Sequence, residues 1–305
     1  MRTKTTCRLI EESIAIGAKI IRFDIWWKDV EPFQDKILWT SLNWYKNLIE
    51  YIVQRNLKPL LIIGTGLPRW FNSLIGKNKN YNYLIDYVYS YAYNVSRAFK
   101  PYVEIYQLGN ELNLTFNVSP QSIIGIDFIE ALCRGIVDGA GDKVKIVNIA
   151  IDYMGWRKFL HKILTDLRKC VDIIGIDHYP RTWSFAGHHD WRILKSVYGD
   201  VEKYGKSLAI TEIGFSTELR ILNKVVIKRE IEQARFVNTA FSSIINMVRE
   251  IPIKFIVWYM LWDENPISCE PSSGLGWCGW GVLRTDFSKK PGWFALKRVF
   301  ELLNS

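Results

Sequence analysis

Two glutamates in this sequence each stand at the end of a short apolar run. The stretch VEIYQLGNELNL (103–114) is rich in β-branched residues and turns polar at Asn110-Glu111. A second run, SLAITEIG (207–214), ends with Glu212. If the two carboxylates face each other across a cleft, one can protonate a leaving oxygen, and the other can attack an anomeric carbon or activate water.

The elements that must position these carboxylates follow a regular alternation. Short apolar runs with β character are separated by longer segments with helical periodicity, as in a parallel sheet covered by helices. No low-complexity linker interrupts the pattern, so we expect one domain over residues 1–305, an α/β fold of the (β/α)8 TIM-barrel type. The predicted strands are 19–26, 58–64, 103–109, 143–150, 171–177, 207–214 and 253–261, and examples of predicted helices are 41–56, 81–99, 122–139, 154–169, 227–250 and 291–303.

The count of predicted strands is seven, one fewer than such a barrel has. The chain opens on a predicted helix (6–18), and MRTKT before it has no strand character. We therefore expect a barrel that lacks its first strand, either because the start is misplaced or because the barrel is short by one strand. If the missing first strand is included in the count, the two glutamates end strands four and seven. These strands lie opposite each other at the carboxyl-terminal mouth of such a barrel.

From Cys7 onward the chain resembles glycoside hydrolase clan A, the cellulase-like retaining β-glycosidases. In that clan an Asn-Glu pair ends strand four and a second Glu ends strand seven, which here are Asn110, Glu111 and Glu212. The other residues that match are Arg22 on strand two, His178 and Tyr179 at the end of strand six, and Trp258 or Trp262 on strand eight.

The resemblance implies a role for each matching residue. Glu212 is the nucleophile and Glu111 the acid and base, while Asn110 binds the sugar 2-hydroxyl and Arg22 and Tyr179 hold Glu212. The phrase VDIIGIDHYP is similar to the sixth strand of families 5, 39 and 53. The third strand carries GTG (64–66), where many family 5 members have Asp-x-His, so the family is left unassigned.

Aromatic residues are abundant, with 13 Trp, 15 Tyr and 15 Phe, and their flat faces can stack on sugar rings. Trp27, which ends the first run, and Trp183, in a loop, join the expected substrate-binding residues. The predicted activity is a retaining hydrolysis of β-linked oligo- or polysaccharides that needs no cofactor. The alternatives are a catalytically impaired carbohydrate-binding barrel and a basic scaffold that binds an anionic polymer.

Other classes of protein fit the sequence less well. The net charge is +9 but is dispersed, so no nucleic acid partner is expected. The group His188-His189-Asp190 is the one metal-like cluster, and adjacent residues rarely converge on one ion, so no metal is predicted. No phosphate-binding loop, Ser nucleophile elbow or dinucleotide fingerprint lies in the right strand–helix context.

The five cysteines bear on the compartment. Cys7, Cys133 and Cys170 lie in helical contexts, where a free buried thiol is the usual state. Cys269 and Cys278 bracket a loop rich in Gly and Ser and are a candidate disulfide, which would imply an oxidising compartment or a thermophilic host. No apolar run reaches the roughly 18 residues of a membrane span, and no secretory signal is present. The expected location is extracellular if a leader precedes the chain and cytoplasmic otherwise; the oligomeric state is not predicted.

Overall fold

A computed structural model describes residues 4–75, 82–115, 121–180, 190–221, 224–263 and 275–304 of the chain. Its helices are α1 (Lys4–Ala15), α2 (Trp27–Val30), α3 (Trp39–Gln54), α4 (Arg69–Ile75), α5 (Asn82–Phe99), α6 (Leu112–Thr115), α7 (Gln121–Ala140), α8 (Trp156–Asp166), α9 (Ile193–Glu202), α10 (Glu230–Val248) and α12 (Pro291–Asn304). Its strands are β1 (Ile20–Trp26), β2 (Lys58–Thr65), β3 (Ile105–Leu108), β4 (Val144–Ala150), β5 (Ile173–His178), β6 (Ser207–Ile213), β7 (Glu218–Ile221), β8 (Lys224–Lys228), β9 (Ile253–Trp258) and β10 (Leu275–Cys278).

The main sheet takes its strands in the order of the chain, β1-β2-β3-β4-β5-β6-β9. Each of its seven strands falls on one of the seven predicted apolar runs, and β1 to β5 pair in parallel. No strand precedes α1 in the described part of the chain. The prediction of an α/β fold of the (β/α)8 type with one strand fewer than eight is therefore confirmed.

The chain divides into two compact units. Among the described residues, unit 1 comprises 19–177 and 199–209, and unit 2 comprises 4–18, 178–198 and 210–304. Strand β6 begins in unit 1 and ends in unit 2, as does β5 at its last residue. The expectation of one domain over the whole chain stays a prediction.

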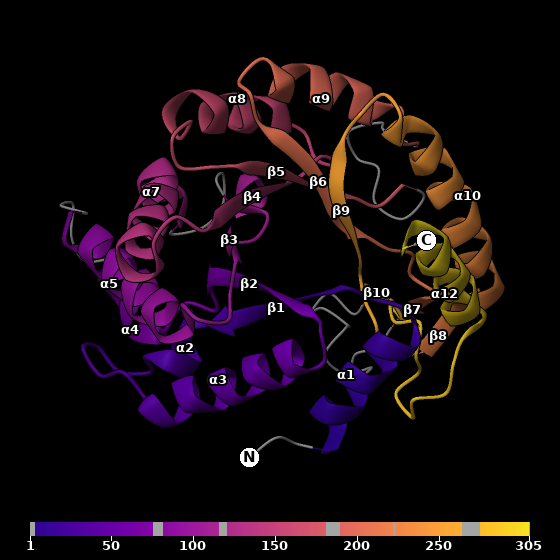
Figure 1. Ribbon diagram of the computed structural model, residues 1–305, viewed down its shortest axis with the longest axis horizontal. Coiled ribbons are helices and arrows are strands. Elements are labelled where there is room, and N and C mark those ends of the chain that lie inside the picture. Colours follow the sequence, from indigo (N-terminus) through magenta and orange to yellow (C-terminus); the bar gives the residue numbers. More distant parts are fainter. Residues whose placement is uncertain are drawn as a thin grey trace. The chain divides into compact units, whose positions relative to one another are not determined.

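The core of unit 1 is built on the strands β2 to β5. Six consecutive residues of β2, from Pro59 to Gly64, are buried, as are all residues of β5, because parallel strands have both faces covered. The helices α3, α5, α7 and α8 lie outside these strands (Figure 1). The register pairs Trp26 with Thr65 and Ala150 with Asp177, so the strands end at one shared edge of the sheet.

Unit 2 adds a small antiparallel sheet in the order β10-β7-β8. Strand β7 follows the end of β6 after four residues and pairs with β10, with Arg220 opposite Gly276. Helices α10 and α12 pack against each other in the same unit. The first strand of this small sheet, β7, therefore follows β6, the strand that carries Glu212, after a short connection.

The cysteines depart from the predicted pattern. Cys133 of α7 and Cys170, just before β5, form a disulfide with their Cα atoms 6.0 Å apart, so the expectation of two free thiols is wrong. The local pattern predicts a helical context for each residue, but it does not predict the proximity of two segments 37 residues apart. Cys7 is a free thiol, as expected. Cys278 is disulfide-bonded, and its predicted partner Cys269 lies outside the described residues.

None of the helices in the described ranges is long and apolar enough to cross a bilayer.

Helices α5 and α7 pack closely because glycines of α7 face α5. A Cβ atom added at Gly135 would lie 2.6 Å from the carbonyl oxygen of Tyr89 and 2.7 Å from the Cβ of Ala92. One added at Gly139 would lie 2.3 Å from Oγ of Ser96. Helix α5 precedes β3 in the chain and α7 follows it, so the two closely packed helices are the long helices on either side of the segment that contains Asn110 and Glu111.

We expect the substitution Gly135→Ala to lower the free energy of unfolding by about 1–3 kcal/mol, because the added methyl group meets backbone atoms that cannot turn away. Urea unfolding checks this. The matched control is Gly199→Ala in the interior of α9, where nothing lies within 4 Å of the added Cβ atom. That substitution is expected to raise the same free energy by up to about 1 kcal/mol. Equal effects at both positions would contradict the close packing of α5 and α7.

Candidate active site

The end of β3 in unit 1 is shaped by two residues with positive φ. Gly109 has φ 71°, and a Cβ atom there would lie 2.6 Å from Cδ1 of Leu112. Glu111 has φ 45°, which is uncommon for a residue other than glycine. Such backbone conformations cost free energy and are found mainly where the surrounding structure enforces them for function. The turn thus presents Asn110 and Glu111 at the carboxyl end of the strand.

Asn110 is fixed by three donors that converge on one atom. Its Oδ1 accepts hydrogen bonds from Nη2 of Arg22 at 2.7 Å, from Nε2 of Gln107 at 3.1 Å and from Nδ2 of Asn148 at 2.9 Å. Only an oxygen can accept from three donors, so this network assigns the orientation of the carboxamide. The amide NH2 group of Asn110, which donates, therefore faces away from Arg22, Gln107 and Asn148.

Asn148 on β4 also holds the backbone of the catalytic candidate. Its Oδ1 accepts a hydrogen bond from the backbone N–H of Glu111 at 3.0 Å, and its Nδ2 donates to Oδ2 of Asp177. Carboxylate oxygens of Glu111 and Asp177 lie within 4.8 Å of each other. Burial, followed by the negative charge of Glu111, raises the pKa of Tyr153. Glu111 is half-buried.

Arg22 lies on β1 and is bound to the same network. Besides Asn110, its Nε donates to Oε1 of Gln107 at 2.7 Å. The structure thus brings together Arg22 and Asn110, two of the predicted binding residues in unit 1. The predicted role of Arg22 beside Glu212 stays a prediction.

Glu212, at the end of β6 in unit 2, is buried and accepts a hydrogen bond on Oε2 from the hydroxyl of Tyr179. The ring of Tyr179 packs edge-on against Trp280 at 5.2 Å and against Tyr259 at 6.2 Å between centroids. Gly214 allows the chain after Glu212 to approach β9, since a Cβ atom there would lie 2.2 Å from the carbonyl oxygen of Tyr259. The structure brings the predicted pair Tyr179 and Glu212 together.

Trp258 is not at the site that the sequence predicted for it. Its side chain is 8% exposed and packs toward Phe236 of α10, with the two rings 6.3 Å apart, so a sugar has no face to stack on. The next residue, Tyr259, contacts Tyr179 and Trp280 instead. Successive residues of a strand point to opposite faces, so the residue after Trp258 is the one beside Tyr179.

Trp27 is also a core residue. Its ring is fully buried and stacks on Tyr91 at 4.6 Å, with Phe71 and Trp70 as further neighbours. Its Nε1 donates to Oε2 of Glu31 at 2.9 Å. The expectation that Trp27 contacts substrate is therefore wrong, because neighbouring side chains of unit 1 cover its whole surface.

His178 has a structural position. It is fully buried in unit 2, packs edge-on against Trp191 at 4.8 Å, and its Nε2 lies 3.0 Å from the carbonyl oxygen of Asp190. A side chain with no exposed surface cannot contact a sugar, so the substrate-binding role predicted for His178 is wrong. Its neighbour Tyr179 supplies a polar contact to Glu212 from this strand end.

The remaining predicted residues are Trp262, Trp183 and the metal-like cluster. Trp262 is half-buried, stacks on Phe287 at 5.2 Å and donates from Nε1 to the carbonyl oxygen of Thr285 at 3.3 Å. Its sugar-binding role stays a prediction. Trp183, His188 and His189 lie outside the described residues. Asp190 is paired with Arg192, whose hydrogen bonds lower the pKa of that carboxyl.

Several residues of these networks were not singled out from the sequence. They are Gln107, Asn148 and Asp177 in unit 1 and Tyr259 and Trp280 in unit 2. A usable signal existed for the first three, since each is a polar residue inside or at the end of an apolar run. A buried polar side chain in a strand needs a partner, which makes it a candidate for a site network.

Comparisons with known proteins find the fold but no close relative. No family model matches the chain, and no curated protein matches it. The structure of GH5_18 from Streptomyces cattleya, in complex with GlcNAc, has a TM-score of 0.75 at 14% identity, over 98% of this chain and 75% of that one. A β-glucosidase from Thermotoga maritima, in complex with azafagomine, also gives 0.75 at 15% identity, over 98% and 86%. Xylanase 10B from Thermotoga petrophila gives 0.68 at 18%, over 97% and 98%.

These structures are glycoside hydrolases of clan A, so the resemblance in fold that the sequence predicted is confirmed. With sequence identities of 14% to 18%, the similarity to these structures is one of fold.

The network around Asn110 yields a prediction on stability. We expect Asn148→Ala to lower the free energy of unfolding by about 1–3 kcal/mol, because it leaves buried partners without their hydrogen bonds. Thermal unfolding measures the change. The control is Asn94→Ala on α5, whose single described hydrogen bond, to the carbonyl oxygen of Ser90, is exposed. It is expected to stay within about 0.5 kcal/mol of the wild type. An unchanged melting temperature for Asn148→Ala would refute the network.

Proposed function

We propose that this protein is a retaining glycoside hydrolase of clan A that cleaves β-linked oligo- or polysaccharides. The observation that carries the proposal is the setting of its two strand-end glutamates. Glu111 is held through its backbone N–H by Asn148, and Glu212 through its carboxylate by Tyr179. The likeness in fold to glycosidases supports it, since barrels of this type carry their chemistry at the carboxyl ends of the strands.

In the first half of the proposed reaction, a carboxylate oxygen of Glu212 attacks the anomeric carbon and forms a covalent glycosyl–enzyme bond. The bond between that carbon and the leaving oxygen breaks, and Glu111 gives its proton to this oxygen. The hydroxyl of Tyr179 holds the plane of the Glu212 carboxylate during the attack, because a hydrogen bond restricts its rotation.

In the second half, Glu111 acts as a carboxylate and takes a proton from water. The oxygen of that water bonds to the anomeric carbon, the bond to Glu212 breaks, and both glutamates return to their starting states. Two displacements at one carbon give net retention of configuration. The amide NH2 group of Asn110 is the donor that we assign to the sugar 2-hydroxyl, because its oxygen already accepts three hydrogen bonds.

The class of substrate is supported by the comparisons. The similar structures are named as β-glucosidases, a xylanase in complex with xylobiose and an exo-β-1,4-mannosidase. We therefore propose a β-linked glycan as substrate, with Trp262 as the aromatic residue offered to a sugar ring.

Replacing the nucleophile should abolish turnover. We expect Glu212→Gln to hydrolyse β-aryl glycosides at a rate indistinguishable from background, because an amide oxygen cannot form the glycosyl–enzyme bond. The assay is release of the aryl alcohol across a panel of sugars. Glu218→Gln, on β7 in the same unit, is the control and should retain the activity of the wild type. Full activity of Glu212→Gln would refute the assignment.

Replacing the acid should have an effect that depends on the leaving group. We expect Glu111→Gln to lower kcat/KM for an unactivated β-glycoside by about 10²–10⁴-fold. The loss should be much smaller in the first step with a dinitrophenyl glycoside, whose leaving oxygen needs no proton. Presteady-state kinetics measure that step. A loss that is equal for both leaving groups would contradict the role of Glu111 as the proton donor.

A further inference from the structure

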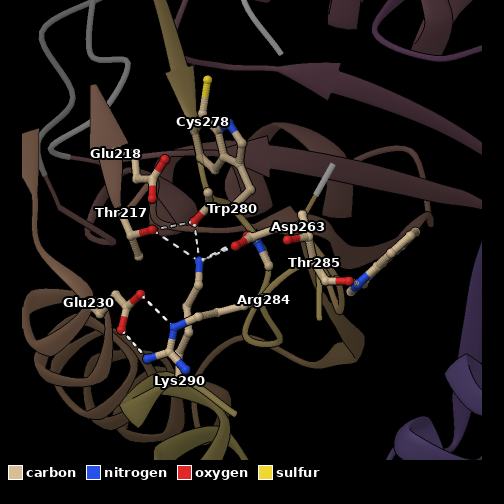
Figure 2. Close-up of polar contacts among 12 residues, drawn as sticks. Thr217, Glu218, Glu230, Asp263, Cys278, Trp280, Arg284, Thr285 and Lys290 are labelled. Atoms are coloured by element: carbon tan, nitrogen blue, oxygen red, sulfur yellow. Dashed lines mark hydrogen bonds and ion pairs between the residues drawn. The ribbon is translucent and has the colours of Figure 1, made fainter. Parts of the chain in front are cut away.

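Lys290 is a buried cation in unit 2. It directly precedes α12, and its side chain is 1% exposed. Its ammonium group lies 2.8 Å and 2.9 Å from the two carboxylate oxygens of Asp263, and it donates to Oγ1 of Thr217 and to the carbonyl oxygen of Gly279, each at 3.0 Å. Figure 2 shows these contacts. Burying an ion is costly unless its hydrogen bonds are satisfied, and here all three N–H donors have acceptors.

The acceptors come from three separate segments of the unit. Thr217 lies between β6 and β7, Gly279 follows β10, and Asp263 lies beyond β9. Burial lowers the pKa of the Lys290 ammonium, and burial raises the pKa of the Asp263 carboxyl. The ion pair thus joins three chain segments in surroundings that exclude water.

Trp280 lies between the two backbone groups that this ion pair holds. On one side the carbonyl oxygen of Gly279 accepts from Lys290, and on the other the N–H of Gly281 donates to Oδ1 of Asp263 at 2.8 Å. Both neighbours must be glycine, since a Cβ atom at Gly279 would lie 2.4 Å from Oγ1 of Thr217, and one at Gly281 2.3 Å from the backbone N of Asp263. Lys290 and Asp263 therefore help to hold the Trp280 backbone. They do so together with Gln233, whose Nε2 donates to the carbonyl oxygens of Trp280 and Gly281, and with Thr217, which donates to the carbonyl oxygen of Gly279.

The ring of Trp280 connects this backbone position to Glu212, the proposed nucleophile, through Tyr179. It is 2% exposed and packs edge-on against Tyr179, whose hydroxyl donates to Glu212. Its Nε1 donates to the carbonyl oxygen of Trp277 at 2.9 Å, which fixes the rotation of the indole. A shift of the Trp280 backbone would move the surface against which Tyr179 rests.

We propose that Lys290 and Asp263 are positioning residues, which set the geometry of Tyr179 and Glu212 through the backbone of Trp280. The catalytic test of this proposal rests on the glycosidase function proposed above. An apolar pair could fill the same volume, but it would leave the N–H of Gly281 without the acceptor that Asp263 provides. It would also remove one donor from the carbonyl of Gly279, which keeps its hydrogen bonds from Thr217. The ion pair therefore contributes to activity in a way that can be separated from stability.

The test is the double variant Asp263→Leu with Lys290→Met. Replacing both members of a buried pair by apolar residues often leaves stability unchanged, whereas Lys290→Met alone leaves the carboxylate of Asp263 buried without its partner and should lower the melting temperature. For the double variant we expect a melting temperature above that of Lys290→Met alone and below that of the wild type, because the buried N–H of Gly281 loses its acceptor. We expect kcat on a β-aryl glycoside to fall by about tenfold or more, because a displaced nucleophile reacts slowly. KM should change by less than about threefold.

The matched control is Lys297→Met on α12, an exposed lysine 3.7 Å from Glu301, and it should leave both kcat and the melting temperature unchanged. A folded double variant with the kcat of the wild type would overturn the proposal. If the double variant does not fold, Thr217→Val removes one acceptor of Lys290 while keeping the side-chain shape. A smaller fall in kcat at unchanged KM is expected there, and an unchanged kcat would overturn the proposal.

A readout without turnover separates this inference from the proposed function. The indole N–H resonance of Trp280, assigned with Trp280→Phe in protein labelled at tryptophan nitrogen, should move in the double variant and stay in place in Lys297→Met. If the wild type hydrolyses no β-glycoside, the proposed function fails while this measurement still tests the positioning. An unmoved resonance in the double variant overturns the positioning whatever the activity.

Discussion

One carboxamide oxygen, Oδ1 of Asn110, is the point on which the candidate site of unit 1 depends. It accepts from a guanidinium on β1, an amide on β3 and an amide on β4. Burying a polar group without a hydrogen bond costs stability. The polar side chains at the ends of these three strands must therefore form hydrogen bonds with one another. The orientation of Asn110 and the position of the Glu111 backbone both follow from this requirement.

The two glutamates are held in different ways, as two different roles require. Glu111 is placed by its backbone, through the positive φ of its own residue and the side chain of Asn148. Glu212 is placed by its carboxylate, through a phenol that aromatic rings hold in position. A proton donor must remain able to exchange its proton with a leaving group and then with water, whereas a nucleophile must keep one direction of attack. The surroundings of each residue suit the role that we propose for it.

The sequence predicted the strands and the strand-end glutamates well, because both depend on local patterns. A continuous apolar run marks a buried parallel strand wherever it lies in the chain, and the polar residue after it lies at the edge of the sheet. The pattern does not say which face a side chain takes within a buried strand, which is why Trp258 was predicted in place of Tyr259. Trp27 and His178 failed for a related reason, since an aromatic or imidazole at a strand end packs inward as readily as outward.

Contacts between distant segments were the other part that local patterns missed. Cys133 and Cys170 come together through the packing of separate elements, and Lys290 meets Thr217 across 73 residues. Local patterns also did not predict the ion pair of Lys290 and Asp263, because neither residue lies in a recognisable motif.

The proposed mechanism requires that Glu212 forms a covalent bond to the sugar during turnover. Incubation with a β-glycoside that carries fluorine at the 2-position and an activated leaving group should trap this intermediate, because the fluorine slows its hydrolysis more than its formation. Digestion and mass spectrometry of the labelled protein then locate the sugar. We expect one sugar on the peptide that contains Glu212 and none on the variant Glu212→Gln. A label on any other residue, or turnover of β-glycosides that continues in the Glu212→Gln variant, would contradict it.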